Sequence, residues 1–474
     1  MKLFTSIKDR IGRVRSRLIP YRDIASAERV KTPIAPEMAR ALALWYDLYR
    51  DRAPWKEPGR VKSLNLCALA ASEIARQVAL ELKWSVTGGG EEASPRAAYL
   101  AAEFGKLMDA LRGKLEQGCA AGGMIVKPWV NPDDGHIYFD FAMDWGICPL
   151  AFDGAGNLSD VIVPDVFRDG ETVYTRLERH TALGDGVVVT QRAFRSSRED
   201  CLGVEVPLGS VARWAALQPE VRVANTGGAL FGWYRVAAAN SVDLECALGA
   251  SVFAKGVEVA REIDMQYSRL LWEFEGGELA VDVDPTALYE KSDGRGRALP
   301  RLNERLFRAV DTGAESTYQV FAPALRDVSL VNGLNQLLIR FEDLCGLSRG
   351  TFSDANVDAR TATELQIAKQ RSYATVADNQ KALEKCLWDV LRAMDVYATL
   401  YNLAPAGEWA ASFEWDDSIL TDVDAQLQQR LLLVNSGIIS KAELRQWYLG
   451  ESEAQAEAAV ARIREEGAKV EGTA

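Results

Sequence analysis

Two long helical patterns joined by a polar loop constrain this chain more than any other feature. The first pattern ends at Cys345-Gly346, and the loop that follows is rich in Gly, Ser, Asn and Asp. The second pattern begins at Thr361-Ala-Thr-Glu364, a capping box in which the Thr hydroxyl and the Glu carboxylate satisfy exposed backbone amides. A loop held between two firm helices is presented at a fixed place, so we expect it to carry function.

A near-heptad stripe of apolar and small residues marks another helix, which we expect to begin at about Ser251. Such a stripe is typical of long helices that pack on neighbours at a shallow angle. Its members are Val252, Gly256, Val259, Ile263, Tyr267, Leu270 and Phe274. Gly276-Gly277 ends the stripe, and the next helical pattern covers Leu325 to Leu344. The sequence therefore predicts two helices that enclose an insertion.

The insertion, up to about Phe321, has the pattern of a small α/β unit. Alternating apolar residues from Leu279 to Val283 predict one strand, and Thr317 to Phe321 predicts another. Between them lies a patch of basic residues, namely Lys291, Arg295, Arg297, Arg301, Arg305 and Arg308. The two helices and the insertion together predict a stalk with a small tip.

The rest of the chain divides into helical and β-rich parts. Residues 36–120 have helical spacing, including Leu69, Ile74, Val78 and Leu82, with breaks at Pro54–Gly59 and at Gly88-Gly89-Gly90. From about Met124 to Ala238, short β-rich runs separated by Asp-Gly and Gly-Asp turns predict an antiparallel meander. A heptad pattern of about forty residues follows Thr361, and capping boxes at Ser440 and Ser452 predict two further helices in the tail.

Charge and cysteine content limit the classes of function. The formal net charge of -12 argues against tight nonspecific nucleic-acid binding, because such binding needs many Lys and Arg contacts to phosphate. The same charge is compatible with DNA that moves past the protein without binding to it tightly. Seven scattered Cys predict reduced, mostly buried thiols. The basic amphipathic segment 1–23 predicts either a helix docked on protein or, less favoured, a helix on a membrane surface.

Motifs for catalysis are missing from the sequence. It contains no phosphate-binding G-x-x-x-x-G-K-[ST] loop, no G-x-S-x-G elbow and no H-E-x-x-H. The two histidines, His136 and His180, lie near predicted turns, and we interpret them as surface residues. The acidic pairs Asp133-Asp134 and Asp416-Asp417 also sit beside turn residues. We therefore expect no enzyme activity, no cofactor and no metal site.

Several short motifs, in order along the chain, resemble those of the portal proteins of tailed bacteriophages. The branch that they resemble is that of siphophage-type viruses of Gram-positive bacteria and related prophages. The motifs are Pro36-Glu-Met, Leu44-Trp45, Ala53-Pro54-Trp55, Val61-Lys-Ser-Leu-Asn-Leu66, Ser72-Glu-Ile-Ala-Arg76, Ala247-Leu-Gly-Ala-Ser251, Thr361-Ala-Thr-Glu364, Trp415-Asp-Asp-Ser-Ile419 and Gly437-Ile-Ile-Ser-Lys441. Ala247 stands where the family usually has Pro. The ordered set covers most of the chain, although no single motif is decisive.

The resemblance implies an α+β portal-protein fold with a defined order of parts. The N-terminal segment 1–23 precedes a wing of helices and antiparallel sheet over 24–240. Residues 241–275 and 323–345 form the two stem helices, and 276–322 form a small α/β clip. A tunnel loop at 346–360 leads to a long helix that returns to the wing over 361–420, and a helical crown occupies 421–474.

The resemblance also implies a function, partners and a location. The chain would form a ring of twelve subunits at the portal vertex of the capsid, made in the host cytoplasm, through which double-stranded DNA enters and leaves. Its partners would be the terminase large subunit, the major capsid and scaffolding proteins, and the head-completion or adaptor proteins, without a membrane. A minor head or scaffold protein without a channel, or an enzyme of unknown type, is the alternative.

The resemblance directs attention to two sets of residues. In the tunnel loop, the residues expected to face DNA are Arg349, Phe352, Ser353, Asp354, Asn356, Asp358 and Arg360. In the clip, Arg295, Arg297 and Arg301 are expected to contact acidic partner surfaces or DNA phosphates. A merely solvated basic patch is the equal alternative for the clip.

Overall fold

The computed structural model describes most of the 474-residue chain, in several stretches. The described residues are 21–80, 82–89, 94–131, 134–283, 306–309, 318–354, 362–415 and 423–471. The chain divides into two compact units, Met1–Phe413 and Glu414–Ala474. Segment 1–20, most of the predicted clip and the second half of the predicted tunnel loop lie outside the described residues.

The first unit begins with four helices. They are α1 (Tyr21–Glu28), α2 (Pro36–Tyr49), α3 (Leu66–Ala79) and α4 (Pro95–Ala121). Of these, α2, α3 and α4 pack on one another, and α1 packs on strand β4 (Cys148–Phe152). Met38, Leu42 and Trp45 are buried along one face of α2, as the helical period predicts. The helical prediction is wrong at Leu82, because strand β1 (Leu82–Thr87) begins there and pairs with the distant strand β14 (Ala410–Trp415).

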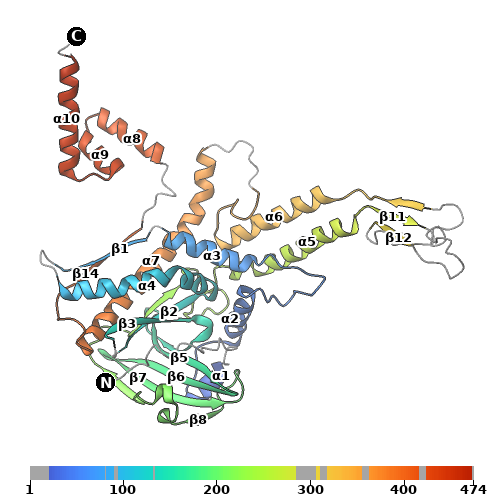
Figure 1. The fold of residues 1–474 in the computed structure, drawn as a ribbon, viewed down its shortest axis with the longest axis horizontal. Helices are drawn as coiled ribbons and strands as arrows, with labels where there is room; N and C mark the ends of the chain where they lie inside the picture. Colours follow the sequence, from blue (N-terminus) through green and yellow to red (C-terminus); the bar gives the residue numbers. More distant parts are fainter. Residues whose placement is uncertain are drawn as a thin grey trace, which may run out of the picture. The chain divides into compact units, whose positions relative to one another are not determined.

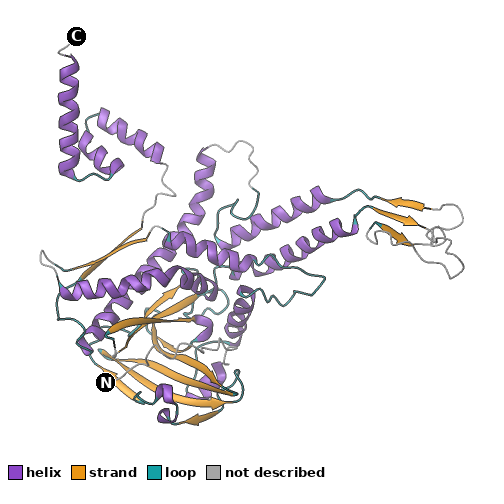
Figure 2. Ribbon diagram, in the orientation of Figure 1, coloured by secondary structure: helices purple, strands orange, loops and turns teal. Residues whose placement is uncertain are grey.

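The β-rich region forms two antiparallel sheets (Figure 2). The smaller has the order β10-β2-β3, with β2 (Gly123–Asn131), β3 (His136–Met143) and β10 (Gly232–Arg235). The larger has the order β4-β5-β6-β7-β8, and β9 also pairs with β7. Its strands are β4 (Cys148–Phe152), β5 (Leu158–Asp169), β6 (Thr172–Leu183), β7 (Gly186–Ser196), β8 (Val204–Val206) and β9 (Glu220–Val223). Consecutive strands from β4 to β8 are neighbours, so the predicted meander is confirmed there, whereas β9 returns to β7 and β10 returns to β2.

The long helix α7 (Ala362–Leu400) packs against β10, β2, α3 and α4. Its heptad positions from Leu383 to Tyr397 are all fully buried, which confirms the predicted stripe. Gly232 on β10 allows the closest approach, because a Cβ atom there would lie 2.2 Å from the carbonyl oxygen of Cys386. The C-terminal half of α7 is therefore part of the core that unites helices and sheets.

Helices α5 (Val257–Gly276) and α6 (Asp327–Cys345) pack side by side and carry a small sheet at one end (Figure 1). This sheet consists of β11 (Ala280–Val283), β12 (Phe307–Ala309) and β13 (Tyr318–Phe321), with β11 in the centre. Gly256 lies where α5 begins, and a Cβ atom there would be 2.9 Å from the Phe341 ring. The predicted stalk with a small tip is thus present, although its first helix begins six residues later than Ser251.

The second unit contains α8 (Val423–Asn435), α9 (Lys441–Leu449) and α10 (Glu453–Glu471). The Ser440 hydroxyl accepts the Glu443 amide, and the Glu443 carboxylate accepts the Ser440 amide, so the capping box predicted at Ser440 is confirmed, whereas Thr361 lies outside the described residues. Ser452 and Gln455 make the equivalent pair of hydrogen bonds at the start of α10.

The architecture is a mixture of helices and antiparallel sheets, as predicted. All seven cysteines are free, and Cys201 is the one that is not fully buried. None of the described helices combines the length and apolar character needed to cross a membrane.

Candidate functional site

The loop after α6 begins with a glycine turn that sets its direction. Gly346 adopts a left-handed conformation with φ of 72°, and its amide donates to the Glu342 carbonyl oxygen. A Cβ atom at Gly346 would lie 2.5 Å from the Thr375 hydroxyl on α7. Only glycine combines this backbone conformation with so close a neighbour, so the turn fixes where the loop leaves the helix pair.

A buried carboxylate, that of Glu342, organises the first half of the loop. Its Oε1 atom accepts the amides of Phe352 at 2.5 Å and Ser353 at 2.7 Å. Its Oε2 atom accepts the Ser353 hydroxyl at 2.8 Å and the Gly350 amide at 3.2 Å. Hydrogen bonds to an ionised acceptor are about twice as strong as neutral ones, so four of them hold the loop as a rigid turn.

Two further contacts hold the surface of the same turn. The Arg349 guanidinium makes a two-pronged ion pair with Asp343, at 2.9 and 3.1 Å. The Asn335 side chain accepts the Asp354 amide at 2.8 Å and donates to the Asp354 carbonyl oxygen at 3.3 Å. Residues 346–354 are therefore fastened to α6 at three separate points.

The predicted loop residues take different positions in this turn. Arg349 and Asp354 are exposed, and the Phe352 ring is half-buried at 6.4 Å from Phe341. Ser353 is buried, and its hydroxyl donates to Glu342, so its side chain is not presented at the surface of the loop. Its role is to hold the turn. Three other predicted residues, Asn356, Asp358 and Arg360, lie outside the described residues.

At the tip carried by α5 and α6, the described residues include its base and its small sheet. Arg326 donates to Glu273 through its guanidinium at 2.6 Å and through its own amide at 3.0 Å. These hydrogen bonds lower the pKa of Glu273 to about 2. In the sheet, Arg308 pairs with Asp282 and lies 4.5 Å from the centre of the Phe321 ring. Arg295, Arg297 and Arg301 lie outside the described residues.

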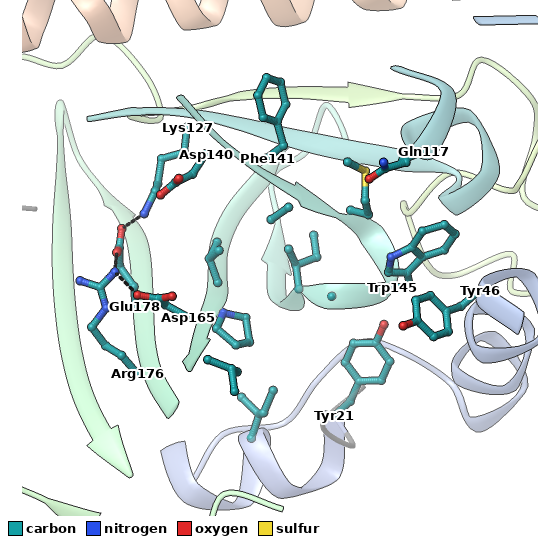
Figure 3. A pocket seen from close by; sticks show the side chains of 18 of the residues that line it. Tyr21, Tyr46, Gln117, Lys127, Asp140, Phe141, Trp145, Asp165, Arg176 and Glu178 are labelled. Atoms are coloured by element: carbon teal, nitrogen blue, oxygen red, sulfur yellow. Dashed lines mark hydrogen bonds and ion pairs between the residues drawn. The ribbon is translucent and has the colours of Figure 1, made fainter. Parts of the chain in front are cut away.

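The β-rich region contains a cluster of buried charges between its two sheets, which the sequence did not lead us to expect. Figure 3 shows Lys127, Arg176 and Glu178 converging at one side of a cavity of about 370 Å³. Glu178 binds Lys127 at 2.6 Å and Arg176 at 3.0 Å. Burial raises the pKa of Glu178, but the two cations outweigh it and hold that pKa well below its ordinary value.

His180 belongs to this cluster, and its interpretation as a surface turn residue is wrong. It is 2% exposed, and its Nε2 atom lies 2.8 Å from Glu178. Arg176, Glu178 and His180 alternate along β6 and so share one face of the strand. That alternation was a signal in the sequence, but either face of the strand could have been the buried one.

This cluster is suited to holding the two sheets of the β-rich region together. Each charge meets an opposite charge inside the protein, as buried ions require. Among the described residues, no group of three or more His, Cys, Asp or Glu side chains could hold a metal ion.

Comparison with known proteins connects this architecture to a family. Residues 311–472, about a third of the chain, match the family model described as phage portal protein, SPP1 Gp6-like. Comparison with curated proteins gave no significant match.

Several solved structures are similar to the chain, and two of them come from gene transfer agent particles. One is from the virion of a native gene transfer agent particle, with a TM-score of 0.40 and 12% sequence identity. The alignment covers 91% of this chain and 99% of that chain. The other is from the neck of a native gene transfer agent particle computed with C12 symmetry, with a TM-score of 0.36 and 10% sequence identity. The alignment covers 89% of this chain and 96% of that chain.

The matched residues include all of α6, the loop fastened by Glu342 and all of α7. The resemblance predicted from the sequence is thereby confirmed, and residues 311–472 identify the chain as similar to the SPP1 Gp6-like phage portal proteins.

Proposed function

We propose that this protein forms the portal of a phage-type particle, a ring at one capsid vertex through which double-stranded DNA is packaged and ejected. The match of residues 311–472 to the portal family carries this proposal. The ring would contain about twelve copies and would act as a conduit and docking platform without catalysis of its own. Closed cyclic rings of identical subunits need two different, complementary surfaces on each copy.

The helix pair and the loop supply a physical basis for the conduit. In this proposal α5 and α6 are the stem helices, β11 to β13 belong to the clip, and residues 346–360 are the tunnel loop. The turn at 346–354 is held rigidly by Glu342, so each copy would place its loop at the same depth. The net charge of -12 suits a wall past which DNA must slide.

The docking role is proposed for the tip. Arg295, Arg297 and Arg301 would contact acidic surfaces of the terminase large subunit and the head-completion proteins, or phosphates at the channel exit. Reversing all three charges should weaken terminase binding and packaging. The same reversal with unchanged binding and packaging would leave the patch as solvated surface only.

Electron microscopy of the purified full-length protein tests the proposal directly. We expect twelve-fold annular particles with a central hole about wide enough for duplex DNA. Because assembly of rings can require a scaffolding partner, particles from infected or induced cells should be examined with an antibody to the chain. Labelling at a single vertex supports the portal, whereas labelling over the whole shell or none supports a minor head or scaffold protein. Substrate turnover by the purified protein would favour an enzyme.

A further inference from the structure

The connection between α2 and α3, residues 50–65, runs along one side of α5, and we call it the strap (Figure 1). Its two ends are fixed, because α2 and α3 bury apolar side chains such as Leu48 and Ile74 in the core. Within the strap, Ala53 and Val61 are also buried. The strap is therefore held at both ends by the body of the first unit, meaning α2 to α4 and the β-rich region.

A buried carboxylate on α5, that of Asp264, accepts two groups of the strap. Asp264 is 5% exposed. Its Oδ2 atom accepts the Trp55 indole N–H at 2.9 Å, and its Oδ1 atom accepts the Leu64 backbone amide at 2.9 Å. A buried carboxylate is stable only if donors replace its water, and here both donors come from the strap. Asp264 therefore holds together two parts of the strap that are nine positions apart.

Ser268 holds the strap one helical turn further along α5. Its Oγ atom accepts the Lys62 backbone amide at 2.9 Å, while its hydroxyl donates to the Asp264 carbonyl oxygen at 2.6 Å. Residues four positions apart on a helix lie on the same face, so Asp264 and Ser268 form one row of attachment points. Lys62 also pairs with Glu275 at 3.6 Å on the surface, which contributes little.

These attachment points lie well beyond the start of α5. The helix begins at Val257, next to the close contact between Gly256 and the Phe341 ring. Ser268 lies 11 positions after Val257, which is about 16 Å along the helix axis. A helix attached only where it begins can pivot there, whereas a second attachment farther along resists the pivot. The strap supplies that second attachment, in addition to the packing of α3 on α5.

Two of the short motifs noted in the sequence meet in this arrangement. Ala53-Pro54-Trp55 and Val61-Lys-Ser-Leu-Asn-Leu66 both lie in the strap or at its end. They contain Trp55, Lys62 and Leu64, which make the three hydrogen bonds to Asp264 and Ser268. The contacts with α5 thus give these motifs a physical role.

We propose that the strap is a brace that fixes the direction in which α5, α6 and their small sheet leave the body of the first unit. Asp264 is the positioning residue of this brace, and Ser268 supports it. Movements of α2 and α3 would reach the helix pair through the same contacts. This proposal does not depend on a ring, on DNA or on any other part of the proposed function, and it can fail or hold independently of them.

Spin-echo distance measurements on the full-length protein test the brace. One spin label is placed at the exposed position Asp109 on α4 and the other at Val328 on α6, which is 67% exposed. Ketone-bearing residues introduced there carry the labels, because the seven native thiols are free. Dilution with unlabelled protein removes distances between copies. We expect Asp264→Ala to widen the distance distribution about twofold, because the helix pair could then pivot where it begins.

Matched controls separate the brace from general destabilisation. A label pair within the body, at Asp109 and at Leu183 on β6, should keep its distribution in Asp264→Ala. Glu262→Gln, exposed on α5, should leave both distributions unchanged. Hydrogen exchange at the Leu64 amide should become about tenfold faster in Asp264→Ala, because a hydrogen bond to a charged acceptor protects it.

Milder variants keep the test decisive if Asp264→Ala does not fold. Trp55→Phe removes the indole N–H and keeps an aromatic ring, and Ser268→Ala removes the second attachment. We expect each to widen the distribution between α4 and α6, and Trp55→Phe to add little when combined with Asp264→Asn, because the two changes remove one shared contact. Faster exchange at Leu64 with an unchanged distribution would overturn the proposal and leave the strap as a packed loop. Equal widening by Glu262→Gln would overturn it as well.

Discussion

Glu342 and Ser353 are joined twice, by the Ser353 amide at 2.7 Å from Oε1 and by the Ser353 hydroxyl at 2.8 Å from Oε2. Eleven positions separate them in the sequence. Glu342 lies in the last turn of α6, and Ser353 lies near the end of the described part of the loop. This pair makes the loop an extension of the helix, so its position follows that of α6.

Replacing Glu342 by Gln should release the loop turn. The side-chain NH2 group of Gln would face backbone amides that need an acceptor. This should lower the free energy of unfolding by about 2–3 kcal/mol. Denaturant unfolding should show this loss of stability, and hydrogen exchange at Gly350, Phe352 and Ser353 should become faster. Glu258→Gln is the matched control, because the Glu258 side chain is 87% exposed on α5. Unchanged exchange at the three amides would contradict the role given to Glu342.

The contact between β10 and α7 predicts opposite effects for two Gly→Ala substitutions. Gly232→Ala would place a Cβ atom 2.2 Å from the Cys386 carbonyl oxygen and should destabilise by about 1–3 kcal/mol. Gly113→Ala, in the exposed interior of α4 with open space around it, should stabilise by about 0.5–1 kcal/mol. Thermal unfolding of the two variants measures both. Equal effects would mean that the helix and the strand are not in close contact.

Asp144 should make the stability of the first unit depend on pH. Burial raises the pKa of Asp144 to about 7, and Trp233 donates to its Oδ1 atom at 3.1 Å. In the unfolded chain the pKa is about 3.9. Between these two values the folded protein keeps a proton that the unfolded chain releases, so stability falls as pH rises from about 4 to 7.

Asp144→Asn removes this titration and should raise stability at pH 8, by on the order of 1–4 kcal/mol. Near pH 4 the variant and the parent should be similar, because the carboxyl is then neutral in both states. Urea unfolding at several pH values measures the difference. Asp109→Asn, on the exposed side of α4, should show no such pH-dependent gain. A constant difference between Asp144→Asn and the parent at all pH values would contradict the assignment.

Replacing Asp354 and Asp358 by Lys should slow DNA translocation more than it harms ring assembly. Added basic contacts raise the affinity for phosphate, so DNA in the proposed channel would be bound more tightly by this loop. A packaging assay compared with the yield of assembled rings measures the two effects, with Asp109→Lys as the control. Poor assembly together with normal DNA passage in the surviving rings would show that the loop is structural.

The sequence by itself determined the elements whose signals are local. The heptad spacing placed Leu383 to Tyr397 of α7 in the core, and Ser440 and Glu443 marked the start of α9. The Gly276-Gly277 break and the alternation after it indicated the helix pair with a small sheet. Periodicity and caps depend on neighbours within a few turns, which is why the sequence shows them directly.

Only the tertiary structure decided which polar residues are inside. Leu82 continues a helical spacing but lies in β1, because β14 offers a pairing edge more than 320 positions away. His180 and Ser353 looked like surface residues, yet each is buried against a carboxylate, Glu178 or Glu342. A buried polar group is stable only where a distant partner satisfies it, and that partner becomes known only when the chain has folded.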